Sequence, residues 1–251
     1  MHLLPIVADS SKNLYFALMS EQLVSLLTEG GYLPVSFLLN GHGSLLDALK
    51  EAKAIGANEV VTYLEPEERD VCFANKSGIG LFLVGRRSPF PEVRSVYTDD
   101  KKGGRLAAEY LLGKKAASYM YIGLDGSECS VRRYEGFREA LAKKGKECSS
   151  VSAQDFTLSG LRDCLLKGKV GIFVYNDEIL FNIALMLRRF NLGKAKVELI
   201  GYDGISRDYE CIGNYPSICF SYKDISRSVY GMLTGKIADR EIVHDVALYR
   251  V

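Results

Sequence analysis

The chain has 251 residues, of which 47% are hydrophobic and 25% are charged. This balance is that of a globular protein able to bury a core, and it excludes the disordered and fibrous classes. The 32 basic and 31 acidic side chains leave a net charge of only +1, so no cationic excess is available to neutralise nucleic-acid phosphates or anionic lipid. At this length one large α/β unit and two lobes are both allowed.

The amino-terminal segment MHLLPIVADSSKN has a short apolar run with no basic region before it and no cleavage site after it, which predicts a first strand and not a signal peptide. No apolar stretch approaches the roughly 18 to 20 residues that cross a bilayer. The six cysteines lack Cys-x-x-Cys spacing, which is typical of a reducing compartment where thiols pack as small apolar side chains. We therefore predict a soluble, cytoplasmic protein without a disulfide framework.

Short apolar runs recur along the chain between stretches of helical period. Continuous runs of this length are typical of strands buried on both faces of a parallel sheet. They occupy residues 3–8, 32–39, 58–64, 80–84, 118–123, 170–175 and 197–202, and VALYRV near the carboxyl terminus is a further candidate.

Helices are predicted in the intervals between these strands. The clearest covers residues 13–29, where leucines recur on one side, and it ends at Gly30-Gly31 because glycine readily adopts the left-handed conformation that follows a helix. Residues 102–113 and 131–144 show the same pattern, each closing on a glycine. The repeated strand–helix–strand order predicts parallel sheets connected by right-handed crossovers.

The alternation is interrupted in the middle of the chain, where two prolines and a charged turn occur within RRSPFPEVRSVYTDDKKGG. We interpret this interruption as a first crossing between two lobes. The chain is expected to cross back near Tyr222-Lys223-Asp224 and again near residues 237–241. The predicted lobes are therefore residues 1–97 with 224–238, and residues 98–223 with 239–251.

A search for catalytic and metal-binding motifs finds none. The sequence has no GxxxxGK[ST] phosphate loop, no GxGxxG after a strand and no GxSxG elbow. None of the three histidines has a second histidine or a cysteine at metal-ligand spacing. Acid pairs such as Asp99-Asp100 are expected to face water at helix starts or in loops. These observations favour a binding protein over an enzyme, with no metal and no cofactor.

Five segments carry a resemblance to one family when they are taken in order. They are VADSSKNLYF near the start, TDDKKGGRLAAEYLL (98–112), SVRRYEGFREAL (130–141), DFT (155–157) and the paired strand ends FVYNDE (173–178) and LIGYDG (199–204). Over nearly the whole chain they resemble the effector-binding core of LacI/GalR-type transcriptional regulators. The resemblance implies an α/β, periplasmic-binding-protein-like type I fold, in which two doubly wound parallel-sheet lobes close on a ligand.

The resemblance also implies a ligand site at the carboxyl ends of the strands, where open parallel sheets generally bind ligands. Arg133 lies three residues before Gly136, the position from which family members reach the ligand with a guanidinium that suits two sugar oxygens or a carboxylate. Asp203 follows a buried strand and can accept from sugar hydroxyls or a purine N–H. The alternatives are a solvated helix arginine and an aspartate that caps the next helix.

Six further residues are expected to contact the ligand: Asp9, Tyr15, Phe16, Phe156, Asn176 and Tyr222. Phe156 aligns with the aromatic ring that family members lay against the ligand, and Tyr15 and Phe16 supply more of the wall, unless these rings belong to the core. Asn176 is expected to face the cleft, while Asp177 caps the helix that follows.

Two positions depart from the family's pattern. Gly85-Arg86 stands where many relatives have an aspartate at the end of the fourth strand, and Tyr222-Lys223-Asp224 stands where a glutamine before proline or aspartate is common. These changes remove a hydroxyl acceptor and add a cation. The effector class therefore stays open among a sugar, a sugar phosphate or other acidic ligand, and a purine.

The expected function is that of the ligand-sensing regulatory core of a LacI/GalR-family transcriptional regulator, which binds a small sugar-like or purine-like effector between two lobes. A homodimer is expected, with the first helix in its interface. DNA binding is expected only through a helix-turn-helix headpiece that this sequence does not include. The rival is a periplasmic-type sugar-binding receptor of a transport system, which six unpaired cysteines disfavour.

Overall fold

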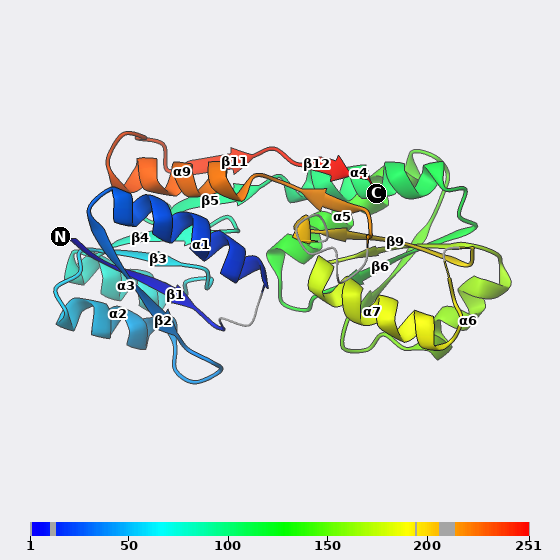
Figure 1. The fold of residues 1–251 in the computed structure, drawn as a ribbon, viewed down its shortest axis with the longest axis horizontal. Helices are drawn as coiled ribbons and strands as arrows, with labels where there is room; N and C mark the ends of the chain where they lie inside the picture. Colours follow the sequence, from blue (N-terminus) through cyan, green and yellow to red (C-terminus); the bar gives the residue numbers. More distant parts are fainter. Residues whose placement is uncertain (1, 11–13, 194, 206–213, 251) are drawn as a thin grey trace. The chain divides into compact units, whose positions relative to one another are not determined.

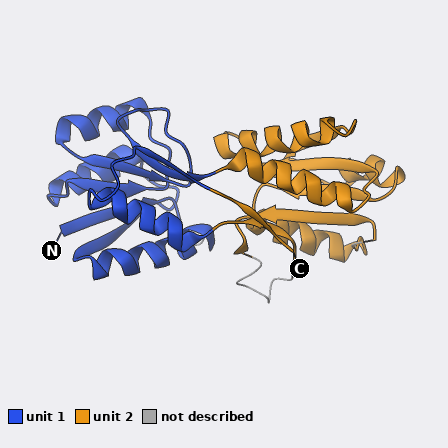
Figure 2. Cartoon of the chain, turned by 90° about the horizontal axis from the view of Figure 1, so that it is seen from above, with its two compact units in different colours: residues 1–98, 221–244 blue, residues 99–220, 245–251 orange. Residues whose placement is uncertain are grey.

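The structure is a computed structural model, and it describes residues 2–10, 14–193, 195–205 and 214–250 (Figure 1). The chain divides into two compact units, which Figure 2 distinguishes by colour. Unit 1 comprises Met1–Thr98 with Ser221–His244, and unit 2 comprises Asp99–Phe220 with Asp245–Val251. No helix in the described ranges combines the length and apolar character that a membrane span requires.

Unit 1 is built on a six-stranded sheet with the order β11-β5-β4-β3-β1-β2, in which every pair is parallel. Helices α1 and α9 pack together on one face of this sheet, and α2 and α3 pack together on the other (Figure 1). Its elements are β1 (His2–Ala8), α1 (Leu14–Glu29), β2 (Tyr32–Leu38), α2 (Leu45–Ala54), β3 (Glu59–Thr62), α3 (Glu68–Ser77), β4 (Gly80–Val84), β5 (Arg94–Thr98), α9 (Tyr222–Leu233) and β11 (Glu241–His244).

Unit 2 contains a second six-stranded sheet, with the order β12-β10-β9-β8-β6-β7. All its pairs are parallel except β10 with β12, which is antiparallel. Its elements are α4 (Asp100–Gly113), β6 (Ser118–Gly123), α5 (Glu128–Ala142), β7 (Cys148–Ser152), α6 (Leu158–Leu166), β8 (Val170–Val174), α7 (Asp177–Arg189), β9 (Val197–Tyr202), β10 (Ser217–Cys219) and β12 (Ala247–Tyr249).

The predicted two-sheet α/β architecture is confirmed, and each apolar run identified in the sequence forms a strand. Every residue of β8 and β9 is buried, as their continuous apolar sequences indicated. The helix predicted for residues 13–29 is α1, and residue 13 lies outside the described residues. Helices α4 and α5 begin earlier than predicted, because the side chains of Asp99 and Ser127 accept backbone hydrogen bonds and cap them.

Four strands were not predicted, namely β5, β7, β10 and β11, because their short sequences carry polar residues that hide the apolar pattern. Strand β11 pairs in parallel with β5, so residues 241–244 belong to the sheet of unit 1. The chain therefore returns to unit 1 at Ser221 and leaves it after His244, whereas we had expected these crossings at residues 224 and 239.

Helices α4 and α5 approach each other closely at two glycines. A Cβ atom added to Gly104 would lie 1.9 Å from the carbonyl oxygen of Arg133, and one added to Gly136 would lie 1.9 Å from that of Lys101. Real side chains cannot occupy such positions, so both helices need glycine at the crossing. This contact holds α5 against the amino-terminal turns of α4 and so places Arg133 next to Asp100.

Replacing Gly136 by alanine should therefore destabilise unit 2. We expect Gly136→Ala to lower the free energy of unfolding by about 1–3 kcal/mol or more, because the methyl group forces the helices apart. The matched control is Gly113→Ala near the end of α4, where an added Cβ meets nothing within 4 Å. That variant should gain about 0.5–1 kcal/mol from helix propensity, and denaturant titration measures both. Equal effects of the two substitutions would contradict the crossing geometry.

Candidate functional site

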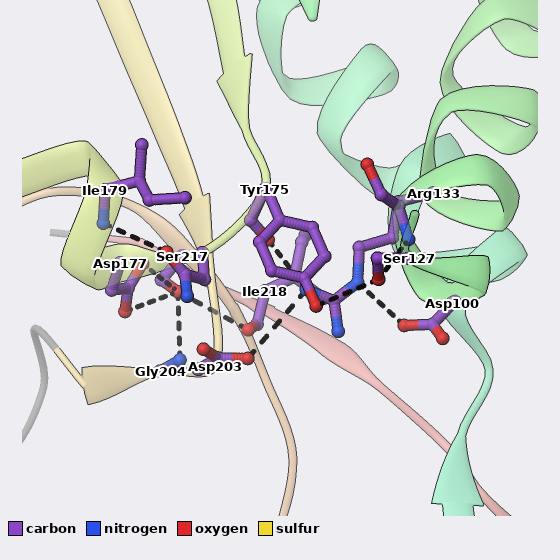
Figure 3. Close-up of polar contacts among 12 residues, drawn as sticks. Asp100, Ser127, Arg133, Tyr175, Asp177, Ile179, Asp203, Gly204, Ser217 and Ile218 are labelled. Carbon is purple, nitrogen blue, oxygen red and sulfur yellow. Dashed lines mark hydrogen bonds and ion pairs between the residues drawn. The ribbon is translucent and has the colours of Figure 1, made fainter. Parts of the chain in front are cut away.

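Arg133 lies at the centre of a buried polar cluster in unit 2 (Figure 3). It is only 5% exposed, so the alternative of a solvated helix arginine is wrong. Its Nε donates to Asp100 Oδ1 at 2.7 Å, and its Nη1 donates to the carbonyl oxygen of Tyr175 at 2.6 Å. The guanidinium carbon lies 3.4 Å from the ring centroid of Tyr202 and 4.7 Å from that of Tyr175. The guanidinium is therefore held by α4, by β9 and by the residue that follows β8.

The charge of Arg133 is secured by its surroundings. Burial by itself lowers the pKa of Arg133, but the carboxylate of Asp100 outweighs this effect and keeps the pKa well above its usual value. Nη2 makes no hydrogen bond within the described part of the chain, since Nε and Nη1 carry all the polar contacts of this side chain. A fixed cation with a free donor can bind a ligand oxygen without reorganising.

Asp203 directly follows β9 and is 5% exposed. Its backbone has φ +99°, a conformation that a residue other than glycine adopts only when its surroundings impose it. The backbone N–H of Asp203 donates to the carbonyl oxygen of Ile218 at 2.9 Å. Its carboxylate Oδ1 lies 4.0 Å from Nη1 of Arg133 (Figure 3). Burial raises the pKa of Asp203 well above its ordinary value, and nearby Asp177 and Asp100 add to this effect, while Arg133 opposes it.

The cap of α7 is Asn176 and not Asp177, which corrects the sequence interpretation, while the contact of Asn176 with a ligand stays a prediction. Asn176 is the cap of α7, since its side-chain oxygen accepts from the backbone N–H of Ile179 at 2.9 Å. Asp177 is fully buried, and both its carboxylate oxygens lie 2.9 Å from the hydroxyl of Ser217, which donates to them. The helix begins one residue earlier than expected, so the capping position falls on the asparagine.

Asp100 is a functional residue that the sequence interpretation missed. The Asp99-Asp100 pair was expected to face water, but Asp100 is 3% exposed and bonded to Arg133, while Asp99 caps α4. The available signal was the position of the pair at the start of a helix, where the first aspartate takes the cap and the second begins the helix. Tyr175 and Tyr202, which cover the guanidinium, were not identified either.

Phe156 is half-buried and lies immediately before Thr157, the residue whose side chain caps α6. Its contact with a ligand stays a prediction. Among the described residues no group of three or more histidine, cysteine, aspartate or glutamate side chains is placed to hold a metal ion. No disulfide joins any two of the five cysteines within those residues, and Cys211 lies outside them.

Unit 1 brings three of the predicted residues into one aromatic cluster. Tyr15 and Phe16, at the start of α1, have ring centroids 5.5 Å apart. The ring centroids of Tyr15 and Tyr222 are 5.9 Å apart, and those of Phe16 and Tyr63 are 5.0 Å apart. Tyr222 is buried at the start of α9, while Tyr15 and Phe16 are half-buried. These rings therefore have a packing role, and their contact with a ligand stays a prediction.

The end of β4 explains one departure from the family pattern. Gly85 has φ +90°, and a Cβ atom there would lie 2.6 Å from the hydroxyl oxygen of Tyr15. A side chain at position 85 is thus incompatible with Tyr15 in its present place. The next residue, Arg86, lies 3.5 Å from Glu65, and its buried Nε has no hydrogen-bond partner among the residues that the structure describes.

Asp9 follows β1 and is exposed. Its carboxylate accepts from the backbone N–H of Gly41 at 3.2 Å, which ties the loop after β2 to the end of β1. The carboxyl ends of β1 and β4 lie on the same edge of the unit 1 sheet, because all its strands are parallel. This edge therefore carries Asp9 and Arg86, whose contact with a ligand is not shown.

Two units, each with a mostly parallel sheet that carries polar residues at its carboxyl edge, give the chain an α/β fold of the periplasmic-binding-protein-like class. Within this class the chain has the fold of solved LacI-family transcriptional regulators, so the resemblance seen in the sequence is confirmed at the level of fold. No family model matches the sequence, and no curated protein matches it either.

Three solved structures illustrate the likeness. A LacI family regulator from Arthrobacter sp. FB24, in complex with lactose, has a TM-score of 0.84 and 18% identity and covers 99% of this chain and 97% of its own. A LacI family regulator from Enterococcus faecium with bound ribose has a TM-score of 0.83 and 17% identity, and it covers 99% of this chain and 97% of its own. A periplasmic binding protein/LacI regulator from Alkaliphilus metalliredigens QYMF, complexed with D-xylulofuranose, has a TM-score of 0.82 and 16% identity, and it covers 100% of this chain and 98% of its own.

The buried ion pair should be essential to the stability of unit 2. We expect Asp100→Asn to lower the free energy of unfolding by about 3–5 kcal/mol, because it leaves the Arg133 guanidinium buried without its carboxylate. The control is Glu139→Gln, which breaks the exposed pair between Lys101 and Glu139 and should cause no measurable loss. Denaturant titration of both variants measures the difference, and an Asp100→Asn variant as stable as the control would contradict this role.

Asp203 should make stability depend on pH. A carboxyl group with a raised pKa in the folded state binds more protons there than in the unfolded chain. Its contribution to stability is therefore largest below its ordinary pKa and falls as pH rises from that value toward the raised one. The side chain in Asp203→Asn cannot ionise. We therefore expect the free energy of unfolding of this variant to increase relative to that of the unmodified protein as pH rises through this range. Urea titrations at a series of pH values measure this, and a difference that stays constant with pH would refute it.

Proposed function

We propose that this chain is the ligand-sensing core of a LacI/GalR-type transcriptional regulator and that it binds a small sugar-like effector. The observation that supports it most strongly is the fixed guanidinium of Arg133, which has a free Nη2 and lies beside Asp203 at the carboxyl edge of the unit 2 sheet. Binding without turnover is part of the proposal, because the chain shares its fold with structures described as transcriptional regulators.

A sugar is the effector class best supported. The three similar structures contain D-xylulofuranose, lactose and ribose. The unit 2 cluster contains three buried carboxyl groups, those of Asp100, Asp177 and Asp203, and one guanidinium, that of Arg133, so its formal charge is negative even when Asp203 is protonated. Such a cluster accepts hydrogen bonds from neutral hydroxyls and repels phosphate. We therefore favour a neutral sugar over a sugar phosphate or a purine at this edge.

Each proposed contact follows from the chemistry of its group. Nη2 of Arg133 donates to a ring or hydroxyl oxygen, and Asp203 accepts from hydroxyls on neighbouring carbons. The amide nitrogen of Asn176 is a donor, since the oxygen is used by the cap of α7. Phe156 offers a ring face to the apolar side of the sugar. We propose Asp9, Tyr15, Phe16 and Tyr222 as contacts from unit 1.

Regulation would act through the populations of two conformations. An effector that binds one conformation more tightly shifts the equilibrium toward it, and this shift can change the affinity for an operator. DNA contact is proposed through a helix-turn-helix headpiece, in a homodimer, because the net charge of +1 gives this chain no cationic surface excess. We also propose a cytoplasmic location, which agrees with the lack of a disulfide among the five described cysteines.

A thermal-shift screen tests the proposed effector class. The panel contains neutral pentoses, hexoses and disaccharides, their phosphates, sugar acids, nucleosides and purines. A true effector at 100 times its dissociation constant adds about 2.7 kcal/mol of stability, which such a screen detects easily. We expect neutral sugars to give the largest shift. A response confined to phosphates or purines would contradict the proposed class.

Calorimetric titration of variants with the best sugar tests the site itself. We expect Arg133→Lys to weaken binding about tenfold or more, because a lysine loses the planar fork and a charged hydrogen bond contributes about 1.5–3 kcal/mol. The control is Arg132→Lys, one position earlier on α5, where the side chain makes a solvent-exposed pair with Glu128. Unchanged affinity in a folded Arg133→Lys variant would refute the assigned role.

A further inference from the structure

Unit 2 contains a hollow with a volume of about 500 Å³ beside the amino-terminal half of α5. It lies between that helix, the end of β6 and the edge strand β7. This volume falls within the range of pockets that bind small molecules.

The sequence of β7 explains why space is left there. Gly123 of β6 pairs with Ser152 of β7, and parallel partners direct their side chains to the same face of a sheet. Cys148, Ser150 and Ser152 alternate onto this face, and the thiol of Cys148 interacts with the hydroxyl of Tyr134 of α5, so the face is the one that α5 covers. Residues this small cannot fill the layer between strand and helix, so the hollow remains.

The hollow is separate from the Arg133 cluster. Ser130 and Tyr134, four residues apart on α5 and therefore on one side of the helix, line the hollow. Arg133 leaves the helix in another direction to reach Asp100 and Tyr175, and none of these three residues lines the hollow. The hollow is therefore a neighbour of the Arg133 cluster that none of these three residues enters, although Asp155 in its lining is next in sequence to Phe156.

One wall of the hollow is apolar and aromatic. The Tyr134 ring stacks on that of Tyr121, with centroids 5.5 Å apart and an interplanar angle of 24°. Leu124 and Val131 line the same hollow and are 38% and 56% exposed, which is high for side chains of this kind. Exposed apolar groups beside a concave surface are typical of binding sites. The apolar face of a small ring would cover them.

The charged groups of the hollow are all acidic. Asp125 and Asp155, both exposed, are the only charged side chains among its described lining residues. Arg138 lies over the Tyr134 ring, with its guanidinium carbon 6.0 Å from the centroid, but it does not line the hollow. Two carboxylates attract a cation and accept from hydroxyl groups, and they repel an anion.

We propose that this hollow is a second small-molecule site and that it takes a hydroxyl-rich ring carrying a positive charge, such as an amino sugar. The apolar ring face lies against Leu124 and Val131, and the ammonium group lies between the carboxylates of Asp125 and Asp155. The hydroxyl of Ser150 on β7 supplies a further polar contact. This site does not depend on the effector proposed for the Arg133 cluster.

Calorimetric titration of the full chain with three related sugars tests the charge preference. D-glucosamine carries an ammonium group, D-glucose is neutral, and D-glucuronate carries a carboxylate. We expect saturable binding with affinities in that order, and Asp155→Asn should remove most of the preference for glucosamine over glucose. Absence of saturable glucosamine binding, or tighter binding of glucuronate, would overturn the proposal.

A pair of serine substitutions on β7 tests the location. Ser150→Tyr places a large ring in the hollow and should weaken glucosamine binding about tenfold or more, because it removes the volume that the ligand needs. Ser149→Tyr is the matched control, since Ser149 is also exposed but alternates to the opposite face of the strand. Equal loss in both tyrosine variants would show that glucosamine binds elsewhere.

Discussion

The ion pair between Arg133 and Asp100 is the interaction on which the arrangement of unit 2 depends. Both groups are almost fully buried, so each charge is tolerable only because the other lies 2.7 Å away. The pair joins α5 to the first turn of α4, while the second nitrogen of the guanidinium bonds to the chain at the end of β8. The same contact therefore sets the geometry of the polar cluster around Arg133 and contributes to the stability of unit 2.

The ion pair forms because α4 and α5 can approach each other closely, and the residues at their crossing allow this approach. Glycines at positions 104 and 136 let the backbones of α4 and α5 meet without intervening side chains. Tyr202 then covers the guanidinium from β9, at a place where Gly103 leaves room for its ring. Small residues in the helices thus determine where the large polar ones lie.

Most of the fold was predictable because its strands are buried on both faces and so have continuous apolar sequences. The missed strands, such as β7 with its sequence CSSVS, lie at sheet edges or carry polar residues, and there the pattern fails. Arg133 and Asp203 were identified through a family resemblance. Asp100 was not, because only the folded packing of α4 on α5 buries one of two adjacent aspartates. The capping role of Asn176 depended on a helix start that propensity locates only approximately.

The contact between Tyr15 and Gly85 bears on how this protein can change over evolution. The hydroxyl of Tyr15 fills the volume that any side chain at position 85 would need. An aspartate there would meet this hydroxyl and would also have to adopt a φ of +90°, which residues other than glycine rarely do, so the Tyr15 side chain would have to move or be replaced by a smaller one. The effect of a substitution at either position therefore depends on the residue at the other.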